Sequence, residues 1–282
     1  MTRSKFTSRG QVHLVIALPL EAQPIIKALK LKRDRNTKAF PLYVNNTRNI
    51  SLIVSGKGAT NCAAATNYIA GMSSNASHVA WLNIGVAGHS NAPLGEMFFA
   101  TKIENTCEIN SFHPTIRRNL SMPGATILSV SNPTSEYPSG VCVDMEAAAF
   151  CQNVKRFAAT ELIHCLKIIS DNQEKPWTDF DIKTLPALFD KNMPKITTFI
   201  EELLHLSDIE AEQNALPEFY QELTQMWKFS QTQGHQLQKL LRRWDALEID
   251  DSPLRTFDAT SLNRNAFLET LEKHLDTIRL EL

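Results

Sequence analysis

The feature that most constrains the fold is an alternation, over the first two-thirds of the chain, of short β-rich runs with helical patterns. The runs QVHLVIAL, ISLIVSG and HVAWLNIGVAG are apolar at nearly every position. Such strands are buried on both faces, and when helices separate them they indicate a largely parallel sheet covered on both sides. The expected strands are Gln11–Leu18, Ile50–Gly56, His78–Gly88, Gly95–Glu104, Gly124–Ser131, Val141–Met145 and Leu162–Asn172, and the expected helices between them are Pro19–Leu31, Asn61–Gly71 and one from about Glu146.

After Leu206 the alternation of apolar runs and helical patterns gives way to a polar stretch followed by helical patterns alone. This change predicts a main domain over 11–206 and an α-helical extension over 207–282. The polar and acidic stretch Ser207–Leu216 is interpreted as a linker. Helical spacing follows over Pro217–Leu247, with Gly234 as a point that kinks or divides it. The last helix carries apolar residues at alternating steps of three and four, namely Leu268, Leu271, Leu275, Ile278 and Leu282.

Composition excludes several classes of protein. The 282 residues carry a net charge of −1, which argues against nucleic acid or a membrane surface as a partner, because both attract basic proteins. No run approaches the roughly 20 apolar residues of a membrane span. Pro19 and Glu21 interrupt the only stretch that resembles a signal peptide. The 5 cysteines are scattered and never spaced C-x-x-C, so we expect a cytoplasmic protein with neither a disulfide framework nor a metal site.

Acids and glycines follow the ends of the expected strands. The carboxyl ends of strands in such sheets form ligand sites, so these residues predict a cleft at one rim. They are Glu21, Gly56 to Gly58, Gly85 to Gly88, Met145, Glu146 and Asp171.

The segment VDMEAAAF, Val143 to Phe150, resembles the signature [VA]-[ED]-M-E-[AS]-x-[AG] of the purine nucleoside phosphorylase and 5′-methylthioadenosine/S-adenosylhomocysteine nucleosidase superfamily. The segments IALPLEAQ, SGKGATNCAAAT, NIGVAGHSNAPLGEMFFAT and IISDN resemble other family segments in the same order, so the resemblance covers roughly Val12 to Leu206. It implies a three-layer α/β sandwich with a mixed, mostly parallel central sheet, a homodimer, and a small-molecule nucleoside as ligand. It also implies a place in nucleoside metabolism such as purine salvage, and no cofactor.

The resemblance assigns roles to four residues. Glu21 matches the base that activates water, and Asp171 matches the acid that protonates the departing purine. Met145 matches the methionine packed against ribose, and Glu146 matches the glutamate bonded to the ribose hydroxyls. These residue types suit the reaction, because N-glycosidic cleavage develops positive charge on the sugar and requires a proton for the leaving base.

Two departures from the family concern substrate binding. Val86 stands where the nucleosidases have Ser or Thr, so the substrate contact at that position lacks a hydroxyl. The segment between Gly95 and Val143 is shortened, which leaves the loop Ser129–Gly140 to bind the base. Tyr137 is the aromatic candidate in that loop for stacking on it.

Three functions remain open from the sequence: a nucleoside hydrolase, a phosphorylase with phosphate as co-substrate, and a nucleoside-binding protein without activity. Water is favoured over phosphate because Pro19 has no amide hydrogen and Glu21 has the wrong charge for an anion site. The residues also have structural interpretations. Asp144 is a candidate helix cap, Glu146 a first-turn acid and Asp171 a turn residue.

Overall fold

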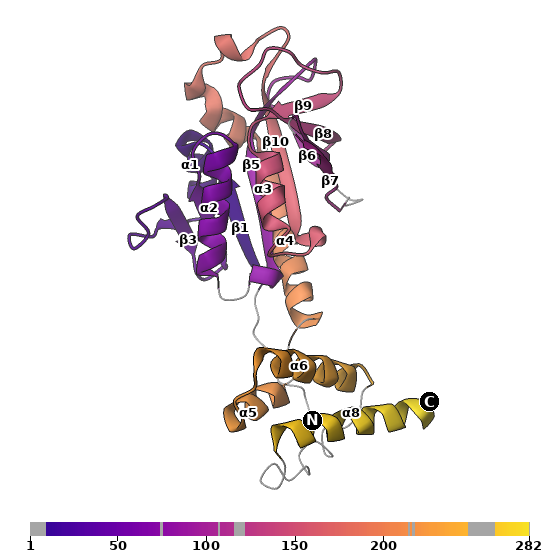
Figure 1. Ribbon diagram of the computed structural model, residues 1–282. Helices are drawn as coiled ribbons and strands as arrows, with labels where there is room; N and C mark the ends of the chain where they lie inside the picture. The colour runs from indigo at the N-terminus through magenta and orange to yellow at the C-terminus, as the bar shows by residue number, and fades with distance from the viewer. Residues whose placement is uncertain are drawn as a thin grey trace. The chain divides into compact units, whose positions relative to one another are not determined.

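The computed structural model describes residues 10–73, 76–106, 108–115, 122–213, 215, 218–247 and 263–281. The chain divides into two compact units, Met1–Gln213 and Asn214–Leu282 (Figure 1). We call them the α/β unit and the helical unit.

Within the described residues, the α/β unit is built on a sheet of ten strands in the order β10-β6-β8-β9-β5-β1-β4-β3-β2, with β7 paired to β6. Apolar runs at the centre of this sheet are buried along their whole length, as in β10 and most of β5. The strands are β1 (Gln11–Ile16), β2 (Lys32–Arg33), β3 (Leu42–Asn45), β4 (Ile50–Val54), β5 (Val79–His89), β6 (Met97–Asn105), β7 (Glu108–Phe112), β8 (Gly124–Ser129), β9 (Val141–Asp144) and β10 (Ile163–Asn172).

Part of the sheet closes into a ring, because β5 pairs with β10 as well as with β9. The ring runs β5-β10-β6-β8-β9 and returns to β5. Among the described pairings, five are parallel and five antiparallel. The expected mixed sheet is confirmed, while parallel pairing is less dominant than the sequence predicts, since β9 and β6 enter the ring antiparallel to β5 and β10.

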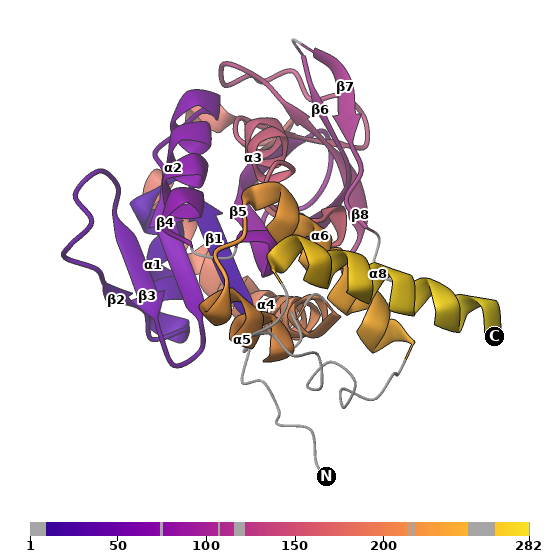
Figure 2. The same cartoon turned by 60° about the horizontal axis from the view of Figure 1, so that its bottom comes forward.

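Helices cover both faces of the sheet and give the expected three layers (Figure 2). Side chains of α1 (Pro19–Ala28) and α4 (Leu185–Gln213) share one apolar cluster, and those of α2 (Ala59–Met72) and α3 (Ala147–Val154) share the other. Strand β1 contributes to both clusters, because Leu14 and Ile16 face the first and Val15 the second. Short 3-10 turns occupy Ala76–His78, Thr160–Leu162, Trp177–Asp179 and Ile182–Thr184.

The prediction of a linker over Ser207–Leu216 is wrong from Ser207 to Gln213, because α4 continues to Gln213. Ser207 is buried, accepts a hydrogen bond from the backbone of Gln11 at 2.8 Å and donates one to the carbonyl of His78. The backbone of Gly10 donates to Asp208. These bonds attach the last two turns of α4 to the start of β1 and to the turn before β5.

The helical unit contains α5 (Glu218–Met226), α6 (Gln231–Ala246) and α8 (Arg264–Glu281). The break within the expected helix 217–247 lies before Ser230, whose side chain and that of Gln233 form a capping box at the start of α6. Gly234, the break expected from sequence, lies inside α6.

The apolar stripe of α8 is buried within the helical unit. Leu268, Leu271 and Leu275 share a cluster with Leu241 and Trp244 of α6. The Ile278 side chain and Leu282 lie outside the described residues. This packing accounts for the stripe without a second chain, so the homodimer stays a prediction that α8 does not support.

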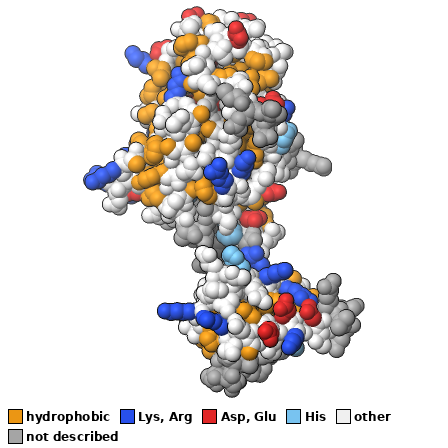
Figure 3. Space-filling view, viewed as in Figure 1, with side chains coloured by type: hydrophobic (Ala, Val, Ile, Leu, Met, Phe, Trp, Pro, Cys, Tyr) orange, Lys and Arg blue, Asp and Glu red, His pale blue; other side chains and the backbone are white. Residues whose placement is uncertain are grey.

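Charged side chains of both signs are interspersed over the face seen in Figure 3, on each of the two units. Over the described part of the chain, every helix is too short or too polar to cross a membrane.

Candidate active site

Glu21 is buried at the third position of α1, where the chain turns from β1 into the helix. Its Oε2 accepts a hydrogen bond from the backbone N–H of Leu18 at 2.9 Å, as in a capping box. Its Oε1 accepts one from the backbone N–H of Val86 on β5 at 3.1 Å. The carboxylate therefore bridges the residues that follow β1 to the neighbouring parallel strand β5. Val86 contributes its backbone here, whereas the sequence pointed to its side chain.

Burial raises the pKa of Glu21 to about 7, with a smaller contribution from the charge of Glu146. The hydrogen bonds from Leu18 and Val86 and the charge of Lys167 act in the opposite direction. A carboxyl group with a pKa near neutral pH is suited to accept a proton.

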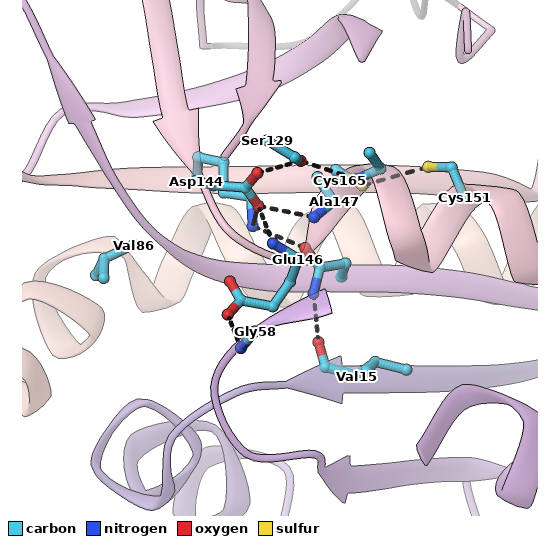
Figure 4. Close-up of polar contacts among 12 residues, drawn as sticks. Val15, Gly58, Val86, Ser129, Asp144, Glu146, Ala147, Cys151 and Cys165 are labelled. Atoms are coloured by element: carbon cyan, nitrogen blue, oxygen red, sulfur yellow. Dashed lines mark hydrogen bonds and ion pairs between the residues drawn. The ribbon is translucent and has the colours of Figure 1, made fainter. Parts of the chain in front are cut away.

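Glu146 lies at the start of α3, directly after β9. Its Oε1 accepts a hydrogen bond of 2.6 Å from the backbone N–H of Gly58. Gly58 has φ +94°, a conformation that glycine adopts without strain, and it is the N-cap residue of α2. Figure 4 shows the Glu146 carboxylate pointing toward Gly58. Met145, the preceding residue in the chain, is half-buried. Burial and the charge of Asp144 raise the pKa of Glu146.

Asp144 binds backbone N–H groups at the start of α3, although the N-cap position of that helix is Glu146. Its Oδ2 accepts from the backbone N–H groups of Ala147 at 2.8 Å and Glu146 at 3.2 Å, and its Oδ1 accepts from Ser129 Oγ at 2.5 Å (Figure 4). The same Oδ2 lies 2.6 Å from Nζ of Lys167.

Lys167 is a site residue that the sequence-based reasoning missed. It lies in the middle of β10, is fully buried, and donates to Asn83 Oδ1 at 2.7 Å besides its ion pair with Asp144. Burial opposes the charge of Lys167, but the carboxylates of Asp144 and Glu146 more than offset it and raise the pKa of the ammonium group. The available signal was a lysine inside an otherwise apolar strand, because such a charge needs a buried partner.

Gly85 on β5 marks where Glu21 and Lys167 approach each other. A methyl group on Gly85 would lie 3.5 Å from Glu21 Oε1 and 3.6 Å from Lys167 Nζ. Glu21, Glu146, Asp144 and Lys167 therefore form one buried cluster of three carboxyl groups and one ammonium group.

Asp171 lies at the end of β10 in a second cluster. Its Oδ2 accepts a hydrogen bond of 2.6 Å from the hydroxyl of Tyr137, and its Oδ1 accepts one of 2.5 Å from Ser170 Oγ. A methyl group on Gly88 would lie 2.7 Å from Asp171 Oδ2 and 2.4 Å from Cε1 of Tyr137, so the position requires glycine. The contact between Tyr137 and Asp171 could not be seen in the sequence, where Tyr137 was assigned to base stacking.

The two clusters lie along the same pair of strands. Gly85 adjoins the first and Gly88 the second, and three residues of a β-strand span about 10 Å. The structure thus places Glu21, Val86 and Glu146 together, and Asp171 with Tyr137 further along β5 and β10. The described residues contain no group of three His, Cys, Asp or Glu side chains arranged to hold a metal ion.

A cavity of about 940 Å³ lies elsewhere, at the amino-terminal ends of β1 and β4. The residues that line it include Gln11, His13, Lys30 and Ser51. It is not lined by any of the residues to which the family resemblance assigns a role. We place the candidate site at the carboxylates, because buried groups with shifted pKa values and convergent polar contacts indicate chemistry better than volume does.

No protein-family model matches this chain, and no curated protein matches it in sequence. Solved structures of nucleosidases share the fold of its α/β unit. The 5′-methylthioadenosine nucleosidase of Arabidopsis thaliana superposes with a TM-score of 0.59 at 15% identity, over 69% of this chain and 96% of that one.

Two bacterial structures show the same likeness. The 5′-methylthioadenosine/S-adenosylhomocysteine nucleosidase of Helicobacter pylori, solved with butyl-thio-DADMe-Immucillin-A, gives a TM-score of 0.57 at 15% identity over 69% of this chain and 99% of its own. The MTAN of Chlamydia trachomatis gives 0.54 at 21% identity, again over 69% and 99%. At these identities the likeness establishes the fold.

Proposed function

We propose that this protein cleaves the N-glycosidic bond of a nucleoside, with a purine as the base and water as the nucleophile. The observation that carries the proposal is the buried Glu21 carboxylate, which has a pKa raised to about 7 and is held by two backbone N–H groups in the same cluster as Glu146 and Lys167. The names of the structural neighbours, which are nucleosidases, support the same reaction class.

In this mechanism Glu21 accepts a proton from water as the water oxygen bonds to C1′ of the sugar. The bond between C1′ and the base nitrogen breaks, and its electron pair stays on the base, which Asp171 protonates. Glu146 uses its Oε2 to accept hydrogen bonds from the ribose hydroxyls, while Oε1 stays on Gly58. Met145 provides an apolar surface under the sugar. The spacing of the two clusters along β5 suits a ligand with its sugar at one end and its base at the other.

Phosphate is the alternative nucleophile, and the local contacts disfavour it. An anion at the end of β1 needs backbone N–H donors, yet the N–H groups of Leu18 and Val86 bind the Glu21 carboxylate. The positive charge of Lys167 is neutralised by Asp144 at 2.6 Å. Glu21 therefore occupies the place that the phosphate dianion requires and repels it.

A nucleoside-binding protein without activity is the second alternative. The contact between Tyr137 and Asp171 favours it, because this contact engages the oxygen that would protonate the base. The absence of a hydroxyl on Val86 points in the same direction. Against it, Glu21, Met145, Glu146 and Asp171 all match the family's residue types.

The test is incubation of the full chain with a nucleoside panel, with and without phosphate, measuring free base and the sugar product. We expect free base and free sugar in phosphate-free buffer. Glu21→Gln and Asp171→Asn should each lower the rate by ~10²–10⁴-fold, since each removes a proton-transfer group. The exposed acids Glu161 and Asp190 provide matched controls as Glu161→Gln and Asp190→Asn, which should keep the wild-type rate.

A sugar 1-phosphate, with a rate that saturates in phosphate, would show a phosphorylase. Binding of a nucleoside without release of base would show the binding protein.

A further inference from the structure

The hydroxyl of Tyr137 connects three segments of the chain. It donates to Asp171 Oδ2 at the end of β10 at 2.6 Å and accepts from the backbone N–H of Trp177 at 3.3 Å. Tyr137 itself belongs to the loop between β8 and β9. With one donor and one acceptor bond made, this hydroxyl has its proton committed to Asp171.

The ring of Tyr137 lies against the backbone of β5 beside Asp171. A methyl group on Gly88 would come within 2.4 Å of its Cε1, and Gly88 is the register partner of Asp171. The tyrosine is 7% exposed, so its ring is packed in the site. Burial and the carboxylate of Asp171 raise the pKa of Tyr137 to about 12, which keeps the hydroxyl protonated as a donor.

A phenol that donates to a carboxylate oxygen presents the same contact as a protonated ring nitrogen of a base. The other oxygen of Asp171 is engaged by Ser170 Oγ at 2.5 Å. A base that takes a proton from Oδ2 therefore meets the Tyr137 hydroxyl at the same oxygen.

We propose that Tyr137 is a positioning residue that holds Asp171 and competes with the base for Oδ2 of that carboxylate. The proposal rests on the function proposed above, in which Asp171 serves the leaving base. Displacement of Tyr137 also releases the N–H of Trp177, so base binding loosens the tie between the loop before β9 and the segment after β10.

The test compares the full-length wild type with Tyr137→Phe, which keeps the ring and removes the hydroxyl. We expect the Kd for free purine base, measured by calorimetry, and the KM of the nucleoside to fall about tenfold, because a net hydrogen bond of this kind no longer opposes binding. Tyr220→Phe is the matched control. Its hydroxyl accepts from Gln238 within the helical unit, and we expect both constants to stay at wild-type values.

A higher KM and weaker base binding in Tyr137→Phe would overturn the proposal, since they would mean that the hydroxyl contacts the base directly. Unchanged constants would overturn it as well. If the wild type binds base but releases none, the proposed hydrolysis fails while the change in Kd still decides the role of Tyr137.

Hydrogen exchange at the Trp177 amide gives a readout without any ligand. In Tyr137→Phe this amide loses its acceptor, so we expect faster exchange there and wild-type exchange along β1. Exchange at Trp177 that does not change would overturn the three-segment contact, and a general increase would show a folding defect.

Discussion

The ionisation of the Glu21 carboxyl group predicts how activity depends on pH. As the proposed base it acts when ionised, and burial raises its pKa to about 7. We expect the ratio of kcat/KM in the wild type to kcat/KM in Glu21→Gln to rise about tenfold per pH unit below pH 7 and to level off above it, because the ratio removes the separate requirement for a protonated Asp171. The measurement is a pH–rate profile, together with the carbon-13 carboxyl resonance of Glu21, identified by its loss in Glu21→Gln. A ratio that is flat from pH 5 to 8 would exclude Glu21 as the base.

The sequence predicts the place of some residues in the site and not of others. Glu21, Glu146 and Asp171 follow strand ends in a recognisable motif, so their positions at one rim were predictable. Lys167 was not, because its partners Asp144 and Asn83 come from β9 and β5, distant in the chain. Its ion pair exists only when these strands lie together.

At the scale of elements, the ion pair between Lys167 and Asp144 joins β10 to β9 and to the start of α3. Lys167→Met should lower the free energy of unfolding by about 3–5 kcal/mol, because it leaves Asp144 as a buried, uncompensated charge. The double variant Lys167→Met/Asp144→Asn removes both charges and should lose less than the sum of the two single variants. Urea denaturation of the full chain measures the four proteins. Strictly additive losses would contradict the coupling.

The sequence patterns did not predict how the strands of the ring pair with one another. Apolar runs identified the buried strands, but periodicity does not distinguish parallel from antiparallel pairing. The short strands β2 and β3 have no apolar run long enough to predict, and they extend the sheet beyond β4. Closure of β5 on both β9 and β10 depends on twist accumulated over the whole sheet.

At the scale of the whole molecule, the boundary between the units predicts where the chain can be cut. Chain 1–213 should fold and retain base release, because every described site residue lies within it. Chain 1–206 loses Ser207 and Asp208, which bind Gln11, His78 and Gly10, and should unfold at a lower temperature. Thermal unfolding of both chains measures the difference. Equal transition temperatures would show that the last turns of α4 are dispensable.

The sequence by itself determined the layers of the α/β unit, the helical character of the remainder and the acids at the strand ends. These follow from burial patterns and motifs that are local in the chain. Only the tertiary structure decided that α4 runs to Gln213, that Lys167 neutralises Asp144 and that Tyr137 binds Asp171. Each of these depends on groups far apart in sequence, and a buried charge or hydroxyl finds its partner only after the strands have assembled.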